Sequence, residues 1–172
     1  MHRQDLQDSE YNAYYRGYIH KLDPETTLDR GFKEGRDTII QFFSSIPEEK
    51  QTYRYAPGKW TPKEIFQHLI DVERVFAYRC FRIARKDKTA LPGFDQDDYI
   101  LPSRANEKNM QDLIGEYKTT RNSFIALLKS LTEEDLKRVG EASGFPLSAR
   151  AAAFMTLGHE KWHMEIIANR YL

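Results

Sequence analysis

Residues 61–83, TPKEIFQHLIDVERVFAYRCFRI, decide the fold because they have the pattern of one long amphipathic helix. Thr61 and Glu64 have the spacing of a capping box, in which each side chain bonds to the other residue's backbone N–H. Pro62 takes the first helical position, where its missing N–H is not needed. The apolar residues recur at the spacing of one helix face. We therefore predict a helix over about 62–85 with this core-facing stripe: Ile65, Leu69, Val72, Phe76, Cys80 and Ile83.

Three other segments repeat the helical periodicity, and strand signals are almost absent. Each begins near a residue that caps helix N-termini or near a proline. Predicted helices span about 24–45 after Asp23-Pro24, about 104–130, and about 149–170 after Ser148, with a further short helical turn capped by Thr132.

The connection over residues 86–103 is long for a compact domain, and connections of this length are usually functional or flexible. Residues 1–22 form a Tyr-rich N-terminal arm, which we expect to pack on the rest of the chain. The expected fold is all-α: one domain over residues 1–172, built as a four-helix bundle with one long crossover loop.

Composition excludes several classes of protein. Lys plus Arg and Asp plus Glu both number 26, so nothing favours nucleic acid or an anionic membrane as partner. The single cysteine, Cys80, excludes an intrachain disulfide framework and a cysteine-based zinc finger. The first ten residues lack the apolar segment of a signal peptide, and no run has the length of a membrane span. We expect a cytoplasmic protein whose partner is a small-molecule substrate.

Three histidines lie on the apolar stripes of the predicted helices. His159 and His163 are spaced i, i+4, so both imidazoles lie on one face of a helix. His68 is on the core-facing side of another helix. Two imidazoles at this spacing, with a third from a facing helix, can hold a cation such as zinc and leave coordination positions open. Spacing alone leaves buried core histidines as an equal alternative.

Residues 159–163 read H-E-x-x-H, the short signature of zinc proteases. Its context does not fit, because the third histidine of one protease class is missing: positions 166 and 169 are Ile and Asn. A ferritin-like di-metal site would need two Glu-x-x-His motifs on inward faces. Only one such motif lies on an inward face here, at Glu160 and His163, so we reject a di-metal site, and the missing context disfavours the protease.

Three neighbours of the histidines have open roles. Gly158 costs helix stability, and it could give clearance beside a metal or substrate, or allow close helix packing. Glu64 and Asp71 flank His68 at helical spacing. Either carboxylate could orient an imidazole, act as a general base, or simply be solvated or ion-paired.

Three motifs carry a family resemblance. Residues 60–74, WTPKEIFQHLIDVER, resemble the first signature of the DinB-like superfamily. Residues 91–99, LPGFDQDDY, resemble the loop that follows it. Residues 158–163, GHEKWH, with RYL at 170–172, resemble its C-terminal signature. Together the motifs cover most of residues 55–172.

The resemblance implies a four-helix bundle in an unusual down-up-up-down order. It also implies one divalent metal ion, nickel or zinc ahead of manganese or iron, held by three histidines. The family's first motif histidine falls on His68 and its closing pair on His159 and His163. Members of the family are commonly homodimers, so a homodimer is expected.

Function within the family varies, so three classes stay open. Some members transfer low-molecular-weight thiols such as bacillithiol to electrophiles, and we expect a metal-dependent transferase of this kind. Phe94, Asp95 and Tyr99 of the long loop would then line the pocket. The first alternative is a metal-dependent hydrolase with Glu64 or Asp71 as general base. The second is a metal-stabilised stress or binding protein without catalysis.

Overall fold

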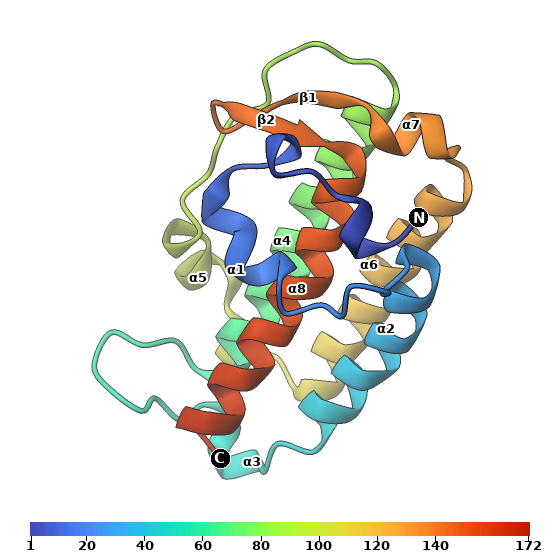
Figure 1. Ribbon diagram of the computed structural model, residues 1–172. Coiled ribbons are helices and arrows are strands. Elements are labelled where there is room, and N and C mark those ends of the chain that lie inside the picture. Colours follow the sequence, from blue (N-terminus) through green and yellow to red (C-terminus); the bar gives the residue numbers. More distant parts are fainter.

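The computed structural model describes residues 1–172 and consists mostly of helices, four of them long (Figure 1). The elements are α1 (Arg16–Ile19), α2 (Leu28–Ser44), α3 (Glu48–Gln51), α4 (Pro62–Ala84), α5 (Asp97–Ser103), α6 (Met110–Lys129), α7 (Glu133–Lys137), β1 (Val139–Ala142), β2 (Phe145–Ser148) and α8 (Ala149–Arg170). Four short 3₁₀ helices span Arg3–Asp5, Asp8–Glu10, Ala13–Tyr15 and Ala105–Glu107.

The four long helices pack as a bundle in which α4 contacts α6 and α8, and α2 contacts the same two helices from the opposite side. The colours of Figure 1 run downward along α2 and α8 and upward along α4 and α6. Because the neighbours α4 and α6 run the same way, residues 85–109 must return along the length of the bundle. The short helix α5 lies on this return.

Three predicted N-caps are confirmed. The side chain of Thr61 accepts a hydrogen bond from the backbone N–H of Glu64, and Glu64 completes the capping box. Ser148 accepts from the N–H of Ala151 at the start of α8, and Thr132 caps α7. These bonds satisfy backbone donors that have no partner within the helix. They fix where α4 and α8 begin, and these two helices carry the three histidines.

Two predicted helix starts are wrong. The Asp23 carboxylate accepts from the N–H of Glu25 at 2.8 Å, which closes a turn rather than a helix. Helix α2 therefore begins at Leu28, capped by Thr27. Helix α6 begins at Met110 instead of 104, because Arg104, with φ +51°, ends α5 and the side chain of Asn109 caps the new helix by accepting from the N–H of Asp112.

The expectation that strands are almost absent misses a β-hairpin. Strands β1 and β2 pair antiparallel, and each has four residues, which is too short to show an alternating pattern. Ser143 and Gly144 both have positive φ in the turn, as a tight hairpin requires. The hairpin accepts a backbone hydrogen bond from Leu91, so it anchors the crossover segment over one end of the bundle.

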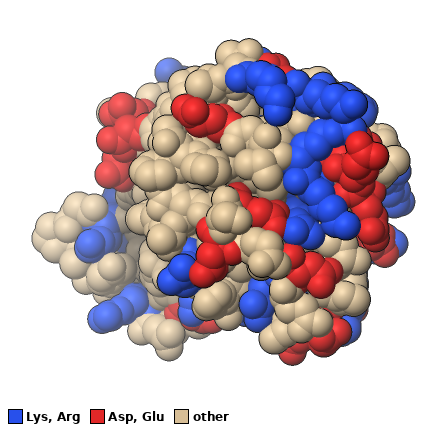
Figure 2. Space-filling model, turned by 45° about the horizontal axis from the view of Figure 1, so that its top comes forward, with Lys and Arg blue, Asp and Glu red and all other residues tan.

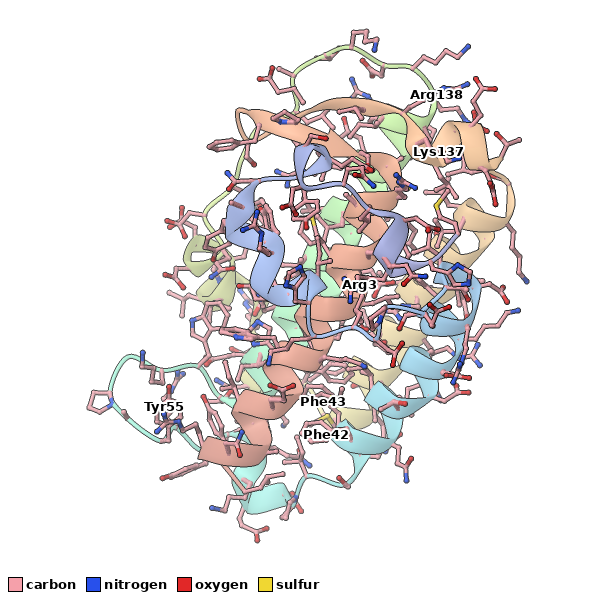
Figure 3. All side chains as sticks on the ribbon, viewed as in Figure 1. Arg3, Phe42, Phe43, Tyr55, Lys137 and Arg138 are labelled. Atoms are coloured by element: carbon pink, nitrogen blue, oxygen red, sulfur yellow. The ribbon has the colours of Figure 1, made fainter.

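Two apolar clusters fill the interior, one toward each end. Phe43, labelled in Figure 3, stacks on Phe66 in the cluster nearer the C-terminus, with ring centroids 3.9 Å apart. Phe32 belongs to the other cluster. Between them, the Arg121 guanidinium lies over the rings of Phe32, at 4.6 Å, and Tyr117, at 5.2 Å. A buried polar layer therefore separates the two apolar regions.

The N-terminal arm packs along α8. Arg150 of α8 donates to the Glu10 carboxylate and, at 3.0 Å, to the carbonyl of Asp5. The backbone N–H of Arg3 donates to Thr26, so the arm is also tied to the segment before α2. Ile19 is buried against the upper apolar cluster. The arm thereby covers the half of α8 that leads to His159.

On the face shown in Figure 2, basic side chains gather at the upper right with acidic side chains beside them, and much of the remaining surface is uncharged. None of the helices has both the length and the apolar character that crossing a bilayer requires.

Candidate metal centre

The packing of α4 on α8 brings three histidines together. His159 and His163 lie one turn apart on α8, and His68 faces them from α4. The His68 and His159 Nε2 atoms are 3.1 Å apart, and those of His163 and His159 are 3.0 Å apart. One ring nitrogen of each residue lies within 4.8 Å of the other two. The three side chains thus present a compact set of nitrogen donors.

All three imidazoles are buried, and burial keeps them neutral. Burial lowers the pKa of His68 to about 4. Burial also lowers the pKa of His159 and His163 well below the usual value, and the neighbouring imidazoles add to this effect. Neutral imidazole is the form that binds divalent metals. The donor set therefore has the protonation state that a metal ligand needs.

The converging nitrogens cannot satisfy one another fully. A neutral imidazole has one N–H and one lone pair. If the Nε2 atoms carry lone pairs, these lone pairs point at each other. If the Nε2 atoms carry hydrogens instead, the buried Nδ1 of His163 keeps a lone pair without a partner. A cation among the three Nε2 atoms would accept these lone pairs and so remove their mutual repulsion. The residues present therefore fit a single divalent metal ion.

An aromatic ring packs against each imidazole. Tyr18 lies edge-on to His159 with ring centroids 5.3 Å apart, Trp60 lies 4.8 Å from His68, and Trp162 lies 4.7 Å from His163. These rings exclude water from the histidines, which explains the lowered pKa values.

A cavity of about 350 Å³ opens onto His159. Most of its wall is aromatic, since Tyr14, Tyr15, Tyr18, Phe76 and Phe94 line it together with Asp95. Of the predicted pocket residues, Phe94 and Asp95 contribute directly. Tyr99 is not part of the wall but stacks on Phe94 from behind, with centroids 5.4 Å apart. A small apolar or aromatic molecule could reach the histidines through this cavity.

The predicted bases Glu64 and Asp71 have partners elsewhere. Glu64 accepts from Arg54 at 2.7 Å and Asn106 at 2.9 Å, and its second oxygen completes the capping box. Asp71 accepts from Gln67 and Arg74 through one oxygen, and burial raises its pKa. Neither residue lines the cavity at His159.

Glu160, the acid of the H-E-x-x-H sequence, points away from the histidines. Its Oε1 accepts from Tyr117, at 2.8 Å, and from Arg121. Arg121 also makes a two-pronged ion pair with Glu73, and this group is almost fully buried. In a zinc protease this glutamate is the general base and must reach the water at the metal. Here Glu160 is held on another face of α8.

Cys80 lies in the core and is fully buried. Burial raises the pKa of its thiol to about 12, so the thiol stays protonated and inert at neutral pH. Any reacting thiol must therefore come from outside the chain.

Sequence reasoning missed the aromatic wall that the N-terminal arm supplies. Tyr14, Tyr15 and Tyr18 read as a packing face, and the structure places all three at the cavity. The signal was present in their helical spacing, but nothing in the sequence shows which helix they meet.

Comparisons with known proteins agree with this picture. A model of the DinB superfamily matches residues 32–167. The structure resembles that of YfiT from Bacillus subtilis, described as a probable metal-dependent hydrolase with an unusual four-helix bundle topology. The TM-score is 0.75 at 14% sequence identity, over 95% of this chain and 89% of YfiT. A search of curated protein sequences gave no match. Since the family model spans most of the chain, including all three histidines, this protein belongs to the DinB superfamily.

Proposed function

We propose that this chain is a metal-dependent transferase that conjugates a low-molecular-weight thiol of the bacillithiol type to small electrophiles. His68, His159 and His163 would hold one divalent ion, nickel or zinc ahead of manganese or iron. The observation that carries the proposal is the convergence of three neutral Nε2 atoms, 3.0 and 3.1 Å apart, beside an aromatic cavity.

A divalent ion bound there would lower the pKa of a thiol or a water molecule at an open coordination position. The chain's own residues supply binding and shielding. Tyr14, Phe76 and Phe94 would hold an apolar electrophile, and Tyr18 and Trp162 would keep bulk water from the imidazoles. Thiol transfer suits this site because it needs neither a protein nucleophile nor a protein base close to the histidines.

The alternative is a metal-dependent hydrolase, which the description of YfiT favours. Hydrolysis would call for a general base near the open position. Asp95 is the one carboxylate in the wall of the cavity, so it replaces Glu64 and Asp71 as our candidate for this role. Turnover without any thiol, lost in Asp95→Asn, would favour the hydrolase over the transferase.

The first experiment measures metal content by elemental mass spectrometry on protein without a His tag. We expect about one metal per chain in the wild type and in His20→Ala, whose histidine is exposed and is not one of the three clustered ligands, and none in His163→Ala. The metal-loaded protein is then assayed with a chromogenic electrophile and several thiols. Bound metal without thiol-dependent turnover would leave the hydrolase or a non-catalytic binding protein, and absence of metal uptake would overturn the proposal.

We also propose a homodimer, the common state in the family. Large apolar side chains that remain exposed, Tyr78, Phe81 and Leu101, are candidates for its interface. Light scattering on the purified protein gives the mass directly.

A further inference from the structure

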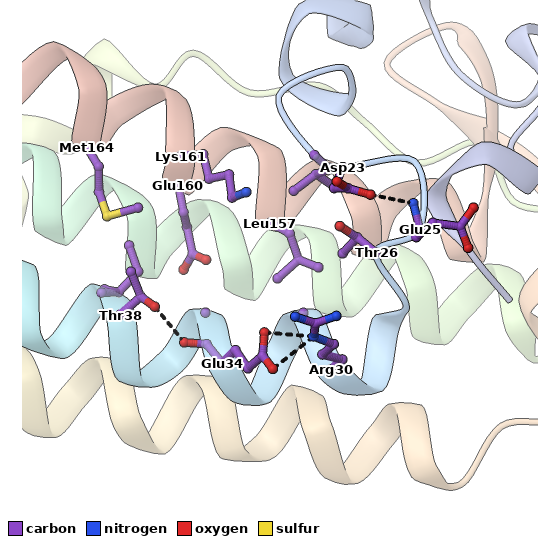
Figure 4. A pocket seen from close by; sticks show the side chains of 14 residues that line it. Asp23, Glu25, Thr26, Arg30, Glu34, Thr38, Leu157, Glu160, Lys161 and Met164 are labelled. Carbon is purple, nitrogen blue, oxygen red and sulfur yellow. Dashed lines mark hydrogen bonds and ion pairs between the residues drawn. The ribbon is translucent and has the colours of Figure 1, made fainter.

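A second and larger pocket lies on another side of α8, away from the histidines. Its volume is about 630 Å³, within the usual range for small-molecule sites. It is formed by α2, α8 and the segment that precedes α2, and none of the three histidines lines it (Figure 4). It is therefore a separate site, and neither the proposed reaction nor the family comparison uses it.

A buried carboxylate forms the floor of this pocket. Glu160 is only 3% exposed, and both of its hydrogen bonds go to Oε1. Oε2 has no partner within the protein. In Figure 4 the Glu160 side chain extends from α8 toward α2, into the pocket. This oxygen is not sealed from solvent, so it can accept a hydrogen bond from a ligand in the pocket.

The charge balance indicates that this ligand is a cation. Glu73 and Glu160 share one guanidinium, that of Arg121, so a single positive charge faces two carboxylates. Burial raises the pKa of Glu73 to about 7 although Arg121 opposes the rise, and the Glu160 carboxylate adds to it. The charged residues of the pocket wall are also mainly acidic: Asp23, Glu25, Glu34 and Glu160 against Arg30 and Lys161.

The acidic groups form two separated ends. Arg30 is already paired with Glu34, at 2.9 and 3.0 Å, so this pair carries no net charge. Asp23 and Glu25 remain on the loop side, and Figure 4 shows the apolar Leu157 between them and Glu160. Carboxylates at both ends of an apolar wall match a flexible chain with a positive charge at each end.

We propose that this pocket binds an aliphatic diamine or polyamine, with one ammonium group on Glu160 Oε2, the alkyl chain along Leu157, and a second ammonium group near Asp23 and Glu25. The proposal goes beyond the proposed enzymatic function and does not depend on a metal at the histidines.

Gly35 lies next to Glu160 Oε2 in the pocket wall. A Cβ at residue 35 would lie 3.9 Å from Glu160 Oε2 and 3.5 Å from the Arg121 guanidinium, both ordinary contact distances. Gly35→Ala should therefore fold, since alanine also favours the helix, while its methyl group crowds the ammonium position.

The test is calorimetric titration of the full-length protein with 1,4-diaminobutane and spermidine. Butylamine, with one charge, and uncharged 1,4-butanediol are the reference ligands. We expect saturable binding of the diamine, at least threefold weaker binding of butylamine, and none of butanediol. Glu160→Gln should weaken diamine binding about tenfold, as loss of a charged hydrogen bond does. Gly35→Ala should weaken it at least threefold.

The matched control is Glu165→Gln, which removes the same charge from α8 outside this pocket and should leave affinity unchanged. His163→Ala excludes binding of the amines at the histidine site, and its affinity should equal that of the wild type. Should Glu160→Gln fail to fold, Gly35→Ala decides the question alone. Absence of saturable diamine binding, or equal affinity in wild type and the folded pocket variants, would overturn the proposal.

Discussion

The backbone carbonyl of Tyr18 lies directly against Gly158: a Cβ at residue 158 would be 2.1 Å from this oxygen. No real Cβ comes so near to another atom, so only glycine allows α1 to approach α8. Of the two open interpretations of Gly158, the structure supports close packing, and what packs there is the N-terminal arm. The same approach sets the Tyr18 ring against His159. Gly158 thereby acts on the candidate metal centre through the arm.

Substituting Gly158 by alanine should displace the arm. The steric clash is expected to cost roughly 1–3 kcal/mol of the free energy of unfolding, more than the helix gains from alanine. The matched control is Gly115→Ala, also inside a helix but with no atom near the new methyl group, which should be neutral or stabilising. Urea unfolding gives the change in unfolding free energy for each of the two variants. Equal effects of the two substitutions would contradict the tight contact.

Metal binding at the three histidines should stabilise the fold. At a free metal concentration a hundredfold above Kd, the gain is about 2.7 kcal/mol. For a domain of this size that corresponds to a rise in Tm of roughly 5–10 °C. Thermal unfolding with added nickel or zinc, and then with chelator, checks the effect and its reversal. His163→Ala should abolish the rise while His20→Ala retains it, and a rise in both would place the metal elsewhere.

Arg121→Met should be among the most damaging substitutions in the chain. It leaves the carboxylates of Glu73 and Glu160 buried without a counter-ion, which costs about 3–5 kcal/mol. Adding Glu73→Gln and Glu160→Gln removes the orphaned charges, so the triple variant should recover more than half of the loss. Chemical denaturation gives the free energy of unfolding of the wild type, the single variant and the triple variant. A single variant within about 1 kcal/mol of wild type would show that the ion pairs are dispensable.

The pair Glu10–Arg150 should make attachment of the arm sensitive to acid. Burial alone would raise the pKa of Glu10, but hydrogen bonds from Arg150 and Ser148 outweigh it and hold the pKa below the usual 4.5. Because the folded-state pKa is the lower one, the stabilisation is complete above pH 4.5 and is lost as the pH falls through the folded-state value.

The measurement compares wild type with Arg150→Met from neutral to acidic pH. The difference in unfolding free energy should be about 2 kcal/mol near neutrality and should shrink below pH 4.5. Arg16→Met, which breaks an exposed pair with Asp8 in the same arm, should change stability by less than about 1 kcal/mol. A difference for Arg150→Met that stays constant into acid would refute the assigned role of Glu10.

Cys80 should be silent in catalysis. Its buried thiol is expected to resist a thiol-specific reagent in the native state and to react fully in denaturant. Cys80→Ala should therefore retain any thiol-dependent turnover at the wild-type rate. Loss of turnover in a folded Cys80→Ala protein would mean that the chain supplies its own thiol.

Helices α4 and α8 could be predicted from the sequence because an N-cap marks the start of each and each runs for more than twenty residues. Local patterns could not give the start of α2, since Asp23 before a proline fits a turn and a cap equally well. The hairpin was not predicted because strands of four residues are too short to show an alternation of apolar and polar residues.

For the candidate site, the spacing of His159 and His163 indicates a shared face, and the stripe that contains His68 indicates an inward direction. Their meeting depends on α4 packing against α8, which no local pattern encodes. Arg121 shows the opposite case. Charged residues are rarely buried, so nothing in the sequence suggests that this arginine lies at the centre of the bundle.

His68 on α4 and His159 on α8 are 91 positions apart along the chain. The complete three-histidine site cannot exist before α4 and α8 have docked, so the full metal affinity appears only when the bundle has formed. Any opening of the interface between α4 and α8 would remove one of the three ligands, so tight metal binding reports that the two helices are docked.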